Sequence, residues 1–368
     1  MNTCALLRQI CRAFCLSGEI TAWEQITTGQ INTTYRVICR QEMQAYLVQK
    51  INPHVFPNAA QVMQNIELVT AHIRHKSGAE DTGQNHLRFF HTRDGGSCLR
   101  LGQDCWRVCN YIPHSIAFSR TDSPAILRSA GEAFGRFAAQ CTDLDSTKLT
   151  ETIPHFHDTP FRLAQLMRHA AEDRCGRCAA AKNEMKIIAQ TQAFAGSLKA
   201  KQDRGALPLR VTHNDTKLSN VLFDRETLRP LTVIDLDTVM PGLIAYDFGD
   251  AIRSAANNAA GEERDFEHPK LDLALFRAFA EGYLRETIGF LTLEERNTLA
   301  EGVLTATLEL AIRYLDDFIT GDHYFRVKNP DQNLRKARRQ LALFQDMRNK
   351  YDDMNRILCE IAEQTENR

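Results

Sequence analysis

Long hydrophobic runs are absent from this 368-residue chain, and no window approaches 18 consecutive apolar residues. We therefore expect no membrane-spanning helix. Arg8 and Arg12 interrupt any apolar core at the N-terminus, so we expect no export signal either. A net charge of one sign is also missing, because the formal value is only -1. The chain therefore has no overall field that would draw it to nucleic acid or to acidic lipid.

Cysteines are present, eleven in all, but they lack the spacing of a disulfide or zinc framework. Cys175 and Cys178 form one Cys-x-x-Cys, and no second such pair completes a zinc site. Others, such as Cys11, stand within amphipathic runs, which is typical of reduced thiols. The sequence thus predicts a cytoplasmic protein.

The order of predicted elements divides the chain into two parts. Strand-like segments and one helix occupy the first third, whereas helical patterns dominate after Pro113, except for a strand-like island at 210–239. This order predicts an α+β, two-lobed, protein-kinase-like fold. Its nucleotide-binding N-lobe would comprise residues 1–111, and its catalytic and substrate-binding C-lobe residues 112–368. The predicted segments include the strands Ala45–Ile51, Leu87–Thr92 and Cys105–Ile112 and the helices Ala59–His75, Leu293–Ile319 and 331–363.

The strand-like island carries His213-Asn214-Asp215 followed by Asn220, which matches the catalytic-loop pattern H-x-D-x-x-x-x-N. Phosphoryl transfer needs a carboxylate that orients the acceptor hydroxyl and hard oxygen ligands for Mg²⁺. We therefore predict Asp215 as the catalytic base and Asn220 as a metal ligand. Lys217 stands where a cation can follow the moving phosphoryl group. We predict that His213 holds the loop by hydrogen bonds.

A predicted hairpin returns the chain to this loop. Residues 221–224 and 231–234 have strand-like patterns, and Asp235 ends the second strand, 20 residues after Asp215. We predict Asp235 as the second Mg²⁺ ligand and Asp237 as a metal-shell or substrate contact. The alternative for any one of these aspartates is a buried hydrogen-bond anchor near a turn.

Asp247-Phe248-Gly249 spells the magnesium-binding triplet of protein kinases, but we predict that Asp247 is a helix cap or a buried anchor. Asp235 already supplies the ligand, and only 12 residues separate it from Asp247, which leaves little room for an activation segment. Asn214 also stands in place of the arginine of H-R-D. Both differences argue against a protein kinase.

Nucleotide contacts are predicted at two places in the N-lobe. The turn with Gly29, Asn32 and Thr33 is a candidate loop over the ATP phosphates, although one glycine is equally typical of an ordinary hairpin. The segment from Asn110 to Ile112 is the candidate hinge, which would contact adenine mostly through backbone groups.

Lys50 ends the third predicted strand and is a candidate for pairing with the α- and β-phosphates. Its alternative is a solvated lysine at the end of a strand. Glu67, on the helix that follows, is the candidate ion-pair partner of Lys50.

Three motifs resemble the aminoglycoside phosphotransferase-like superfamily, in particular its N-acetylhexosamine 1-kinases: HNDTKLSNVLFD, VIDLDTVMPG and AYDFGDAIR. The similarity extends from TTGQINTTYRV to ELAIRYLDDFITGDHYFRVKNPDQNLRKARRQLALFQDM. The resemblance implies transfer of the γ-phosphoryl group of ATP, with Mg²⁺, to the anomeric hydroxyl of N-acetylglucosamine or N-acetylgalactosamine. By position it implies Asp215 and Asp235 in substrate binding and Arg313 and Tyr324 as sugar contacts. Without the resemblance, the alternative for Arg313, an ordinary surface or ion-pair arginine, would be favoured. Lys50 stands where the family often has arginine.

Other functions stay open on sequence alone. A kinase of the same fold could act on another sugar, an amino alcohol or an aminoglycoside, because acceptor choice depends on C-lobe loops. A non-catalytic nucleotide-binding protein is the third hypothesis, and the complete catalytic motif argues against it. The stretch Arg326–Arg339 holds six basic residues and one acidic residue, which favours a neutral sugar over a polycationic antibiotic. The sequence predicts no oligomeric state.

Overall fold

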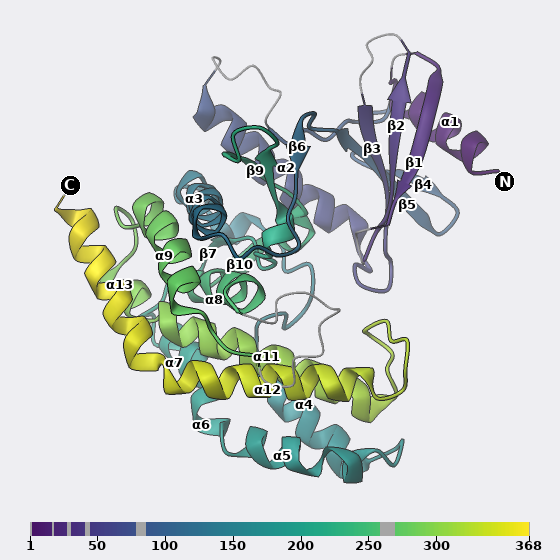
Figure 1. The fold of residues 1–368 in the computed structure, drawn as a ribbon. Coiled ribbons are helices and arrows are strands. Elements are labelled where there is room, and N and C mark those ends of the chain that lie inside the picture. The colour runs from purple at the N-terminus through teal and green to yellow at the C-terminus, as the bar shows by residue number, and fades with distance from the viewer. Residues whose placement is uncertain are drawn as a thin grey trace.

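The computed structural model describes residues 2–16, 18–27, 31–40, 45–78, 86–257 and 269–367. The proposed boundary between the N-lobe and the C-lobe is residue 111. The N-lobe contains a five-stranded antiparallel sheet in the order β1-β2-β3-β5-β4 (Figure 1). Its strands span Ile20–Ile26 (β1), Thr33–Cys39 (β2), Ala45–Ile51 (β3), Leu99–Leu101 (β4) and Asp104–Asn110 (β5).

The alternation of side chains gives this sheet two different faces. On the outer face, Val48 of β3 and Trp106 of β5 belong to a core that also includes residues of α1, Thr3–Ala13. On the inner face, Ile51 and Cys105 belong to the larger core that continues into the C-lobe. The position of a residue along β3 therefore decides whether its side chain faces the C-lobe.

The helix α2, Ala59–Ser77, connects the N-lobe to the strand-like island at 210–239 (Figure 1). Its Asn65 is 1% exposed and donates to the carbonyl of Val239 at 2.8 Å and to that of Thr150 at 2.7 Å. These bonds satisfy a buried amide and fix α2 against the C-lobe.

The C-lobe is mainly helical, and α3 and α9 pack along each other at close approach. A Cβ atom at Gly282 would lie 2.0 Å from the carbonyl oxygen of Arg128, so only glycine fits there. The helix α11 packs against α4, α8 and α12. The helices span Pro124–Gln140 (α3), Thr159–Glu172 (α4), Lys182–Ala189 (α5), Gln192–Ala195 (α6), Ser197–Asp203 (α7), Ile244–Ala255 (α8), Leu273–Thr287 (α9), Leu293–Asn297 (α10), Leu299–Thr320 (α11), Gln332–Asn349 (α12) and Tyr351–Glu366 (α13).

Two small sheets hold the strand-like island among these helices. The first pairs β7 with β10, and the second has the order β6-β8-β9. Val221 lies opposite Val233 in the β8–β9 hairpin, so residues 220 and 234 are neighbours at its open end. The strands span Ser115–Ile116 (β6), Arg210–Thr212 (β7), Val221–Asp224 (β8), Pro230–Val233 (β9) and Met240–Gly242 (β10).

The predicted α+β class is confirmed, with differences in individual elements. The predicted helix Leu293–Ile319 is two helices, because Thr298 bonds back to the carbonyl of Glu295 at 2.9 Å where α10 ends. The predicted helix 331–363 is divided into α12 and α13. The predicted strand Leu87–Thr92 is reduced to an isolated bridge between Phe89 and Cys109, beside the start of β5 where β4 pairs.

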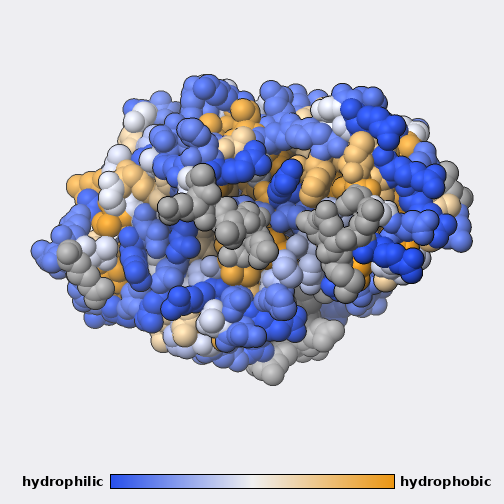
Figure 2. Space-filling view, turned by 90° about the horizontal axis from the view of Figure 1, so that it is seen from above, coloured by the Kyte–Doolittle hydropathy of each residue, from blue (hydrophilic) through white to orange (hydrophobic). Residues whose placement is uncertain are grey.

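The surface is largely hydrophilic on the face drawn in Figure 2, with smaller hydrophobic areas between the polar side chains. Among the described residues, no helix combines the length and the apolar composition that a membrane crossing requires.

Candidate active site

The catalytic loop follows β7 and continues into the short helix η3, Leu218–Asn220. The amide Nδ2 of Asn220 donates to Oδ2 of Asp215 at 2.9 Å and to its backbone carbonyl at 2.8 Å. Nζ of Lys217 lies 2.9 Å from the same Oδ2 atom. These contacts fix the carboxylate through Oδ2, and no hydrogen bond or ion pair from the described part of the chain occupies its Oδ1 atom.

His213 connects this loop to the β8–β9 hairpin. The ring is fully buried and lies edge-on to Phe134 and Phe137. Its Nε2 donates to the carbonyl of Ile234 at 3.0 Å, and its Nδ1 accepts from the N–H of Asp215 at 3.3 Å. These partners require a neutral ring with the proton on Nε2. His213 therefore ties Asp215 to the residue that precedes Asp235.

Asp235 has a positive φ of 64°, which is an uncommon conformation for a residue with a side chain. Desolvation by the surrounding protein and repulsion from Asp237 and Asp215 raise the pKa of Asp235 to about 7. Asp235 is nevertheless exposed to solvent. A bound cation would relieve its repulsion from Asp237 and Asp215. The N–H of Ile234 donates to the carbonyl of Asn220 at 2.8 Å. The structure thus brings Asp215, Asn220 and Asp235 together.

The donor set of this site fits Mg²⁺, which prefers carboxylate and amide oxygens. Asn220 donates to Asp215 through Nδ2, so its Oδ1 atom takes no part in that hydrogen bond. Asp235 supplies an exposed carboxylate between two others that repel it. We propose Asn220 and Asp235 as the residues that would hold the ion.

Asp247 does not belong to this group of ligands. Its carboxylate accepts from the backbone N–H of His213 at 2.8 Å and from that of Asn214 at 2.7 Å. Burial raises the pKa of Asp247 in spite of these bonds. Asp247 lies within α8, which begins at Ile244, so it is not the helix cap that was one of its two predicted roles. The residue anchors the catalytic loop, as the sequence interpretation proposed.

The predicted phosphate loop is only partly described, because Gly29 lies outside the described residues. Thr33 opens β2 and pairs in register with Lys50. Asn32 does not point to free space, since its Nδ2 donates to Oδ2 of Asp237 at 2.6 Å. This bond joins the N-lobe turn directly to the segment after Asp235.

Lys50 lies on the outer face of the sheet, paired in register with Trp106 of the outer core. Its Nζ forms an ion pair with Asp104 at 3.5 Å. The predicted partner Glu67 is instead 2.7 Å from His91. The structure therefore does not bring Lys50 to the catalytic loop, because a one-residue step along a strand changes the face.

The candidate hinge lies where β5 ends. The side chain of Asn110 donates to the carbonyl of His86 at 3.0 Å and accepts from the N–H of Arg88 at 2.7 Å. Its side chain thus holds a neighbouring segment. The backbone N–H groups of Asn110 and Tyr111 are also bound, to the carbonyls of Arg88 at 3.0 Å and of Ala45 at 3.1 Å. The adenine contact of this segment therefore stays a prediction. Ile112 is buried, and its carbonyl accepts from the hydroxyl of Ser115 at 2.7 Å.

Arg313 lies on α11 among aromatic side chains. Its guanidinium carbon is 5.0 Å from the ring centre of Phe156, 5.4 Å from that of Tyr324 and 5.7 Å from that of Phe325. Its Nη2 also lies 3.3 Å from the hydroxyl of Tyr324. The predicted sugar contacts Arg313 and Tyr324 are therefore neighbours, and the aromatic faces already hold a cation.

His157 lies near Arg313, and no sequence signal predicted this residue. Its Nδ1 lies 2.9 Å from Oε1 of Glu309, and its ring stacks on Tyr246 with centres 4.6 Å apart. Burial lowers the pKa of His157, but the charge of Glu309 outweighs it and the net shift is upward. His157 also interacts electrostatically with Arg313 and with Asp250, and Asp250 acts in turn on Lys217.

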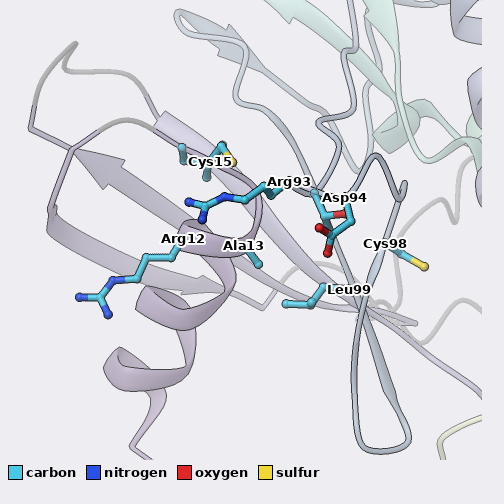
Figure 3. Close-up of a pocket in the computed structure, with 9 residues that line it drawn as sticks. Arg12, Ala13, Cys15, Arg93, Asp94, Cys98 and Leu99 are labelled. Carbon is cyan, nitrogen blue, oxygen red and sulfur yellow. The ribbon is translucent and has the colours of Figure 1, made fainter.

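A separate cavity of about 820 Å³ lies on the N-lobe, between the end of α1 and residues 92–99. Figure 3 shows Arg12 and Arg93 toward one end of it and Cys98 toward the other. None of the predicted site residues lines this cavity. We assign it no part in the chemistry of Asp215.

Comparison with known proteins gives the family. A family model described as "Phosphotransferase enzyme family" matches residues 22–288, which is more than half of the chain. The chain belongs to this phosphotransferase family. The matched region of the phosphotransferase contains the catalytic loop, the hairpin and α8, whereas Arg313 and Tyr324 lie beyond it.

Solved structures with a similar fold include three kinases of small molecules. A spectinomycin phosphotransferase in complex with ADP and spectinomycin has a TM-score of 0.57 at 14% identity, covering 99% of this chain and 97% of that chain. A Plasmodium vivax ethanolamine kinase has a TM-score of 0.53 at 14% identity, covering 87% of this chain and 82% of that chain. A choline kinase from Cryptosporidium parvum Iowa II has a TM-score of 0.54 at 11% identity, covering 98% of this chain and 96% of that chain. These similarities confirm the kinase-like fold of the phosphotransferase.

Proposed function

We propose that this phosphotransferase transfers the γ-phosphoryl group of ATP to the anomeric hydroxyl of an N-acetylhexosamine, N-acetylglucosamine or N-acetylgalactosamine. The observation that carries the proposal is the fixed carboxylate of Asp215, held through one oxygen by Asn220 and Lys217 beside Asp235. The other oxygen is left for the acceptor. ATP as the donor agrees with the ADP in the structure of the spectinomycin enzyme.

In the proposed reaction, Oδ1 of Asp215 accepts a hydrogen bond from the acceptor hydroxyl and receives its proton. The hydroxyl oxygen forms the new bond to the γ-phosphorus while the bond to the β–γ bridging oxygen breaks, and ADP leaves. Lys217 stands beside Asp215 to stabilise the charge of the moving group. Asn220 and Asp235 would hold Mg²⁺, which neutralises phosphate charge when bound.

The surroundings of Arg313 support a neutral acceptor. Choline and ethanolamine are cations, and a site for them would use free aromatic faces or unpaired carboxylates. Here the rings of Phe156 and Tyr324 already contact the guanidinium of Arg313, and Glu309 is paired with His157. The remaining N–H groups of Arg313 suit carbonyl and hydroxyl oxygens. The choice of the anomeric hydroxyl itself rests on the sequence resemblance.

The alternative is a kinase of the same fold with a different acceptor, since enzymes of this fold act on spectinomycin, ethanolamine and choline. A panel assay of ADP release separates the candidates. We expect turnover with N-acetylglucosamine or N-acetylgalactosamine and little with choline, ethanolamine or spectinomycin. Phosphorus NMR of the product should then show a sugar 1-phosphate. A strong preference for an amine acceptor, or phosphate on another carbon, would refute the proposal.

A further inference from the structure

A buried ion pair joins the N-lobe sheet to the loop that follows Asp235. The side chains of Arg107 on β5 and Asp237 in η4, Leu236–Thr238, are 2% and 3% exposed. Nη1 of Arg107 donates to Oδ1 of Asp237, and its Nε donates to Oε1 of Gln49 at 3.0 Å. The pair connects residues 130 positions apart, so it forms only when the two lobes are together.

The second oxygen of Asp237 also faces the N-lobe. Its Oδ2 accepts from Nδ2 of Asn32 at 2.6 Å, and Oδ1 of Asn32 accepts in turn from the N–H of Asn52 at 3.0 Å. Asn32 belongs to the turn that the sequence predicts to cover the ATP phosphates. Both oxygens of one carboxylate are therefore bound to N-lobe elements that would surround the nucleotide.

The faces of the sheet explain why Arg107 has this position. Gln49 and Arg107 pair in register on the inner face, whereas Lys50 lies on the outer face. Protein kinases place a lysine of the third strand at the phosphates and pair it with a glutamate of the following helix. In this chain the corresponding inward residue of β3 is the neutral Gln49. The charge stands one strand away, on Arg107, and its partner comes from the loop after Asp235.

The backbone of Asp235 shows what this connection can do. A residue with a side chain keeps a positive φ only where its surroundings hold it there. On one side of Asp235, the backbone of Ile234 is held by Asn220 and His213. On the other side, Asp237 is held by Arg107 and Asn32. The carboxylate of Asp235 thus extends from a segment that is clamped at both ends.

We propose that Arg107 and Asp237 are positioning residues, which couple closure of the N-lobe over the nucleotide to the orientation of Asp235 toward Mg²⁺. The inference rests on the proposed use of Mg·ATP but on no particular acceptor. Loss of the pair loosens one end of the segment, which the bonds of Thr152 to Asp237 and of Thr238 to His213 still hold in part, and lets Asp235 leave its strained conformation. The protein then holds Mg·nucleotide less well, although Asp235 itself is unchanged.

A purely structural ion pair makes a different prediction, and a double variant separates the two. Arg107→Met alone leaves a buried carboxylate unpaired and should lower Tm, whereas Arg107→Met with Asp237→Leu removes both charges and should recover much of it. Binding of a non-hydrolysable ATP analogue is then titrated with Mg²⁺ by calorimetry. We expect the double variant to need about 10- to 100-fold more Mg²⁺ for half-maximal enhancement, the effect typical of lost outer-sphere support.

The matched control is Lys201→Met with Glu301→Leu, which removes a half-buried C-lobe ion pair of 2.6 Å. This variant should keep the Mg²⁺ dependence of the wild-type protein. Wild-type Mg²⁺ dependence in the Arg107 and Asp237 double variant would overturn the inference. If that variant does not fold, Asp237→Asn, which preserves the side-chain shape, gives the same readout with the same decisive outcome.

Failure of the proposed acceptor leaves this test intact, because the titration contains no acceptor. An inactive acceptor panel with normal Mg²⁺-dependent analogue binding removes only the sugar assignment. Analogue binding by the wild-type protein that ignores Mg²⁺ would overturn the coupling itself.

Discussion

The proposed catalytic segment of this phosphotransferase, residues 210–247, and its proposed acceptor side, the side chains around Arg313, are built in different ways. In residues 210–247 the side chains are fixed largely by backbone groups of the same segment, as when Asp247 accepts two consecutive N–H groups of the catalytic loop. Around Arg313, side chains contact side chains that come from distant helices and loops. A segment whose side chains are fixed by its own backbone keeps the same chemistry. A site formed by side chains from separate elements can change its acceptor when one of them is substituted.

The largest effect should come from Asp215→Asn, which tests the catalytic segment alone. The amide cannot take the proton of the acceptor hydroxyl, and kcat should fall about 10²- to 10⁴-fold. The KM for ATP should change little, because Asn220 and Asp235 are retained. Steady-state kinetics with the preferred acceptor measures both values.

Asp224→Asn is the control for this substitution, because Asp224 holds only the hairpin turn, through the N–H of Thr227 at 2.7 Å. That variant should keep wild-type kcat. Near-normal turnover of Asp215→Asn would remove Asp215 from the mechanism.

The next largest effect should come from Arg313→Met, which tests the acceptor side alone. Lost hydrogen bonds from a charged donor cost about 1.5–3 kcal/mol, so the KM for the acceptor should rise about 10- to 100-fold. The KM for ATP should stay the same. Arg88→Met removes a similar cation–π contact, 5.2 Å from Phe90 in the N-lobe, and should change neither constant. An Arg313→Met effect on ATP instead of the acceptor would contradict the division into two sides.

The part of the pH dependence that His157→Gln removes should identify the contribution of His157, because the pKa of Asp235 in the catalytic segment, about 7, lies in the same range. Because Glu309 raises the pKa of His157 in the folded protein, this contribution to stability is complete below the ordinary pKa of about 6.5. It is then lost as the pH rises through the raised value. Tm of the wild-type protein should therefore fall relative to that of His157→Gln above about pH 6.5, and the acceptor KM should rise over the same range.

His72→Gln serves as the control, since His72 also lies beside a carboxylate, 3.0 Å from Asp143, at the far end of α2. It should leave the pH dependence of the acceptor KM unchanged. If His157→Gln leaves the pH dependence of the acceptor KM as in the wild-type protein, His157 takes no part in acceptor binding.

The same contrast explains what the sequence could predict. Asp215, Asn220 and Asp235 follow from spacing, because a hairpin of fixed length returns the chain to its starting point. The boundaries of β3 also followed from its pattern, Ala45–Ile51. His157 gave no signal, because a single histidine has no period and its partner Glu309 is 152 residues away.

The ion pair of Arg107 and Asp237 was out of reach for the same reason, since its partners meet only through the packing of the two lobes. Lys50 shows the limit within a correctly predicted strand. The position of Lys50 at the end of the strand predicted a contact with the ATP phosphates. The alternation of side chains along the strand, however, turns Gln49 rather than Lys50 toward the C-lobe. Where two adjacent strand residues are both polar, as Gln49 and Lys50 are, the sequence pattern does not show which of them faces the core.

The smallest effect should therefore come from Lys50→Met. Its ion pair with Asp104 is partly exposed, and exposed pairs contribute about 0–1 kcal/mol. The KM for ATP should change less than about threefold and kcat should not change, whereas the double variant of Arg107 and Asp237 should need about 10- to 100-fold more Mg²⁺ to bind the ATP analogue. Initial rates at varied ATP measure this directly. A large rise of the KM for ATP in Lys50→Met would mean that the nucleotide is bound on a face of the sheet that this structure turns away from Asp215.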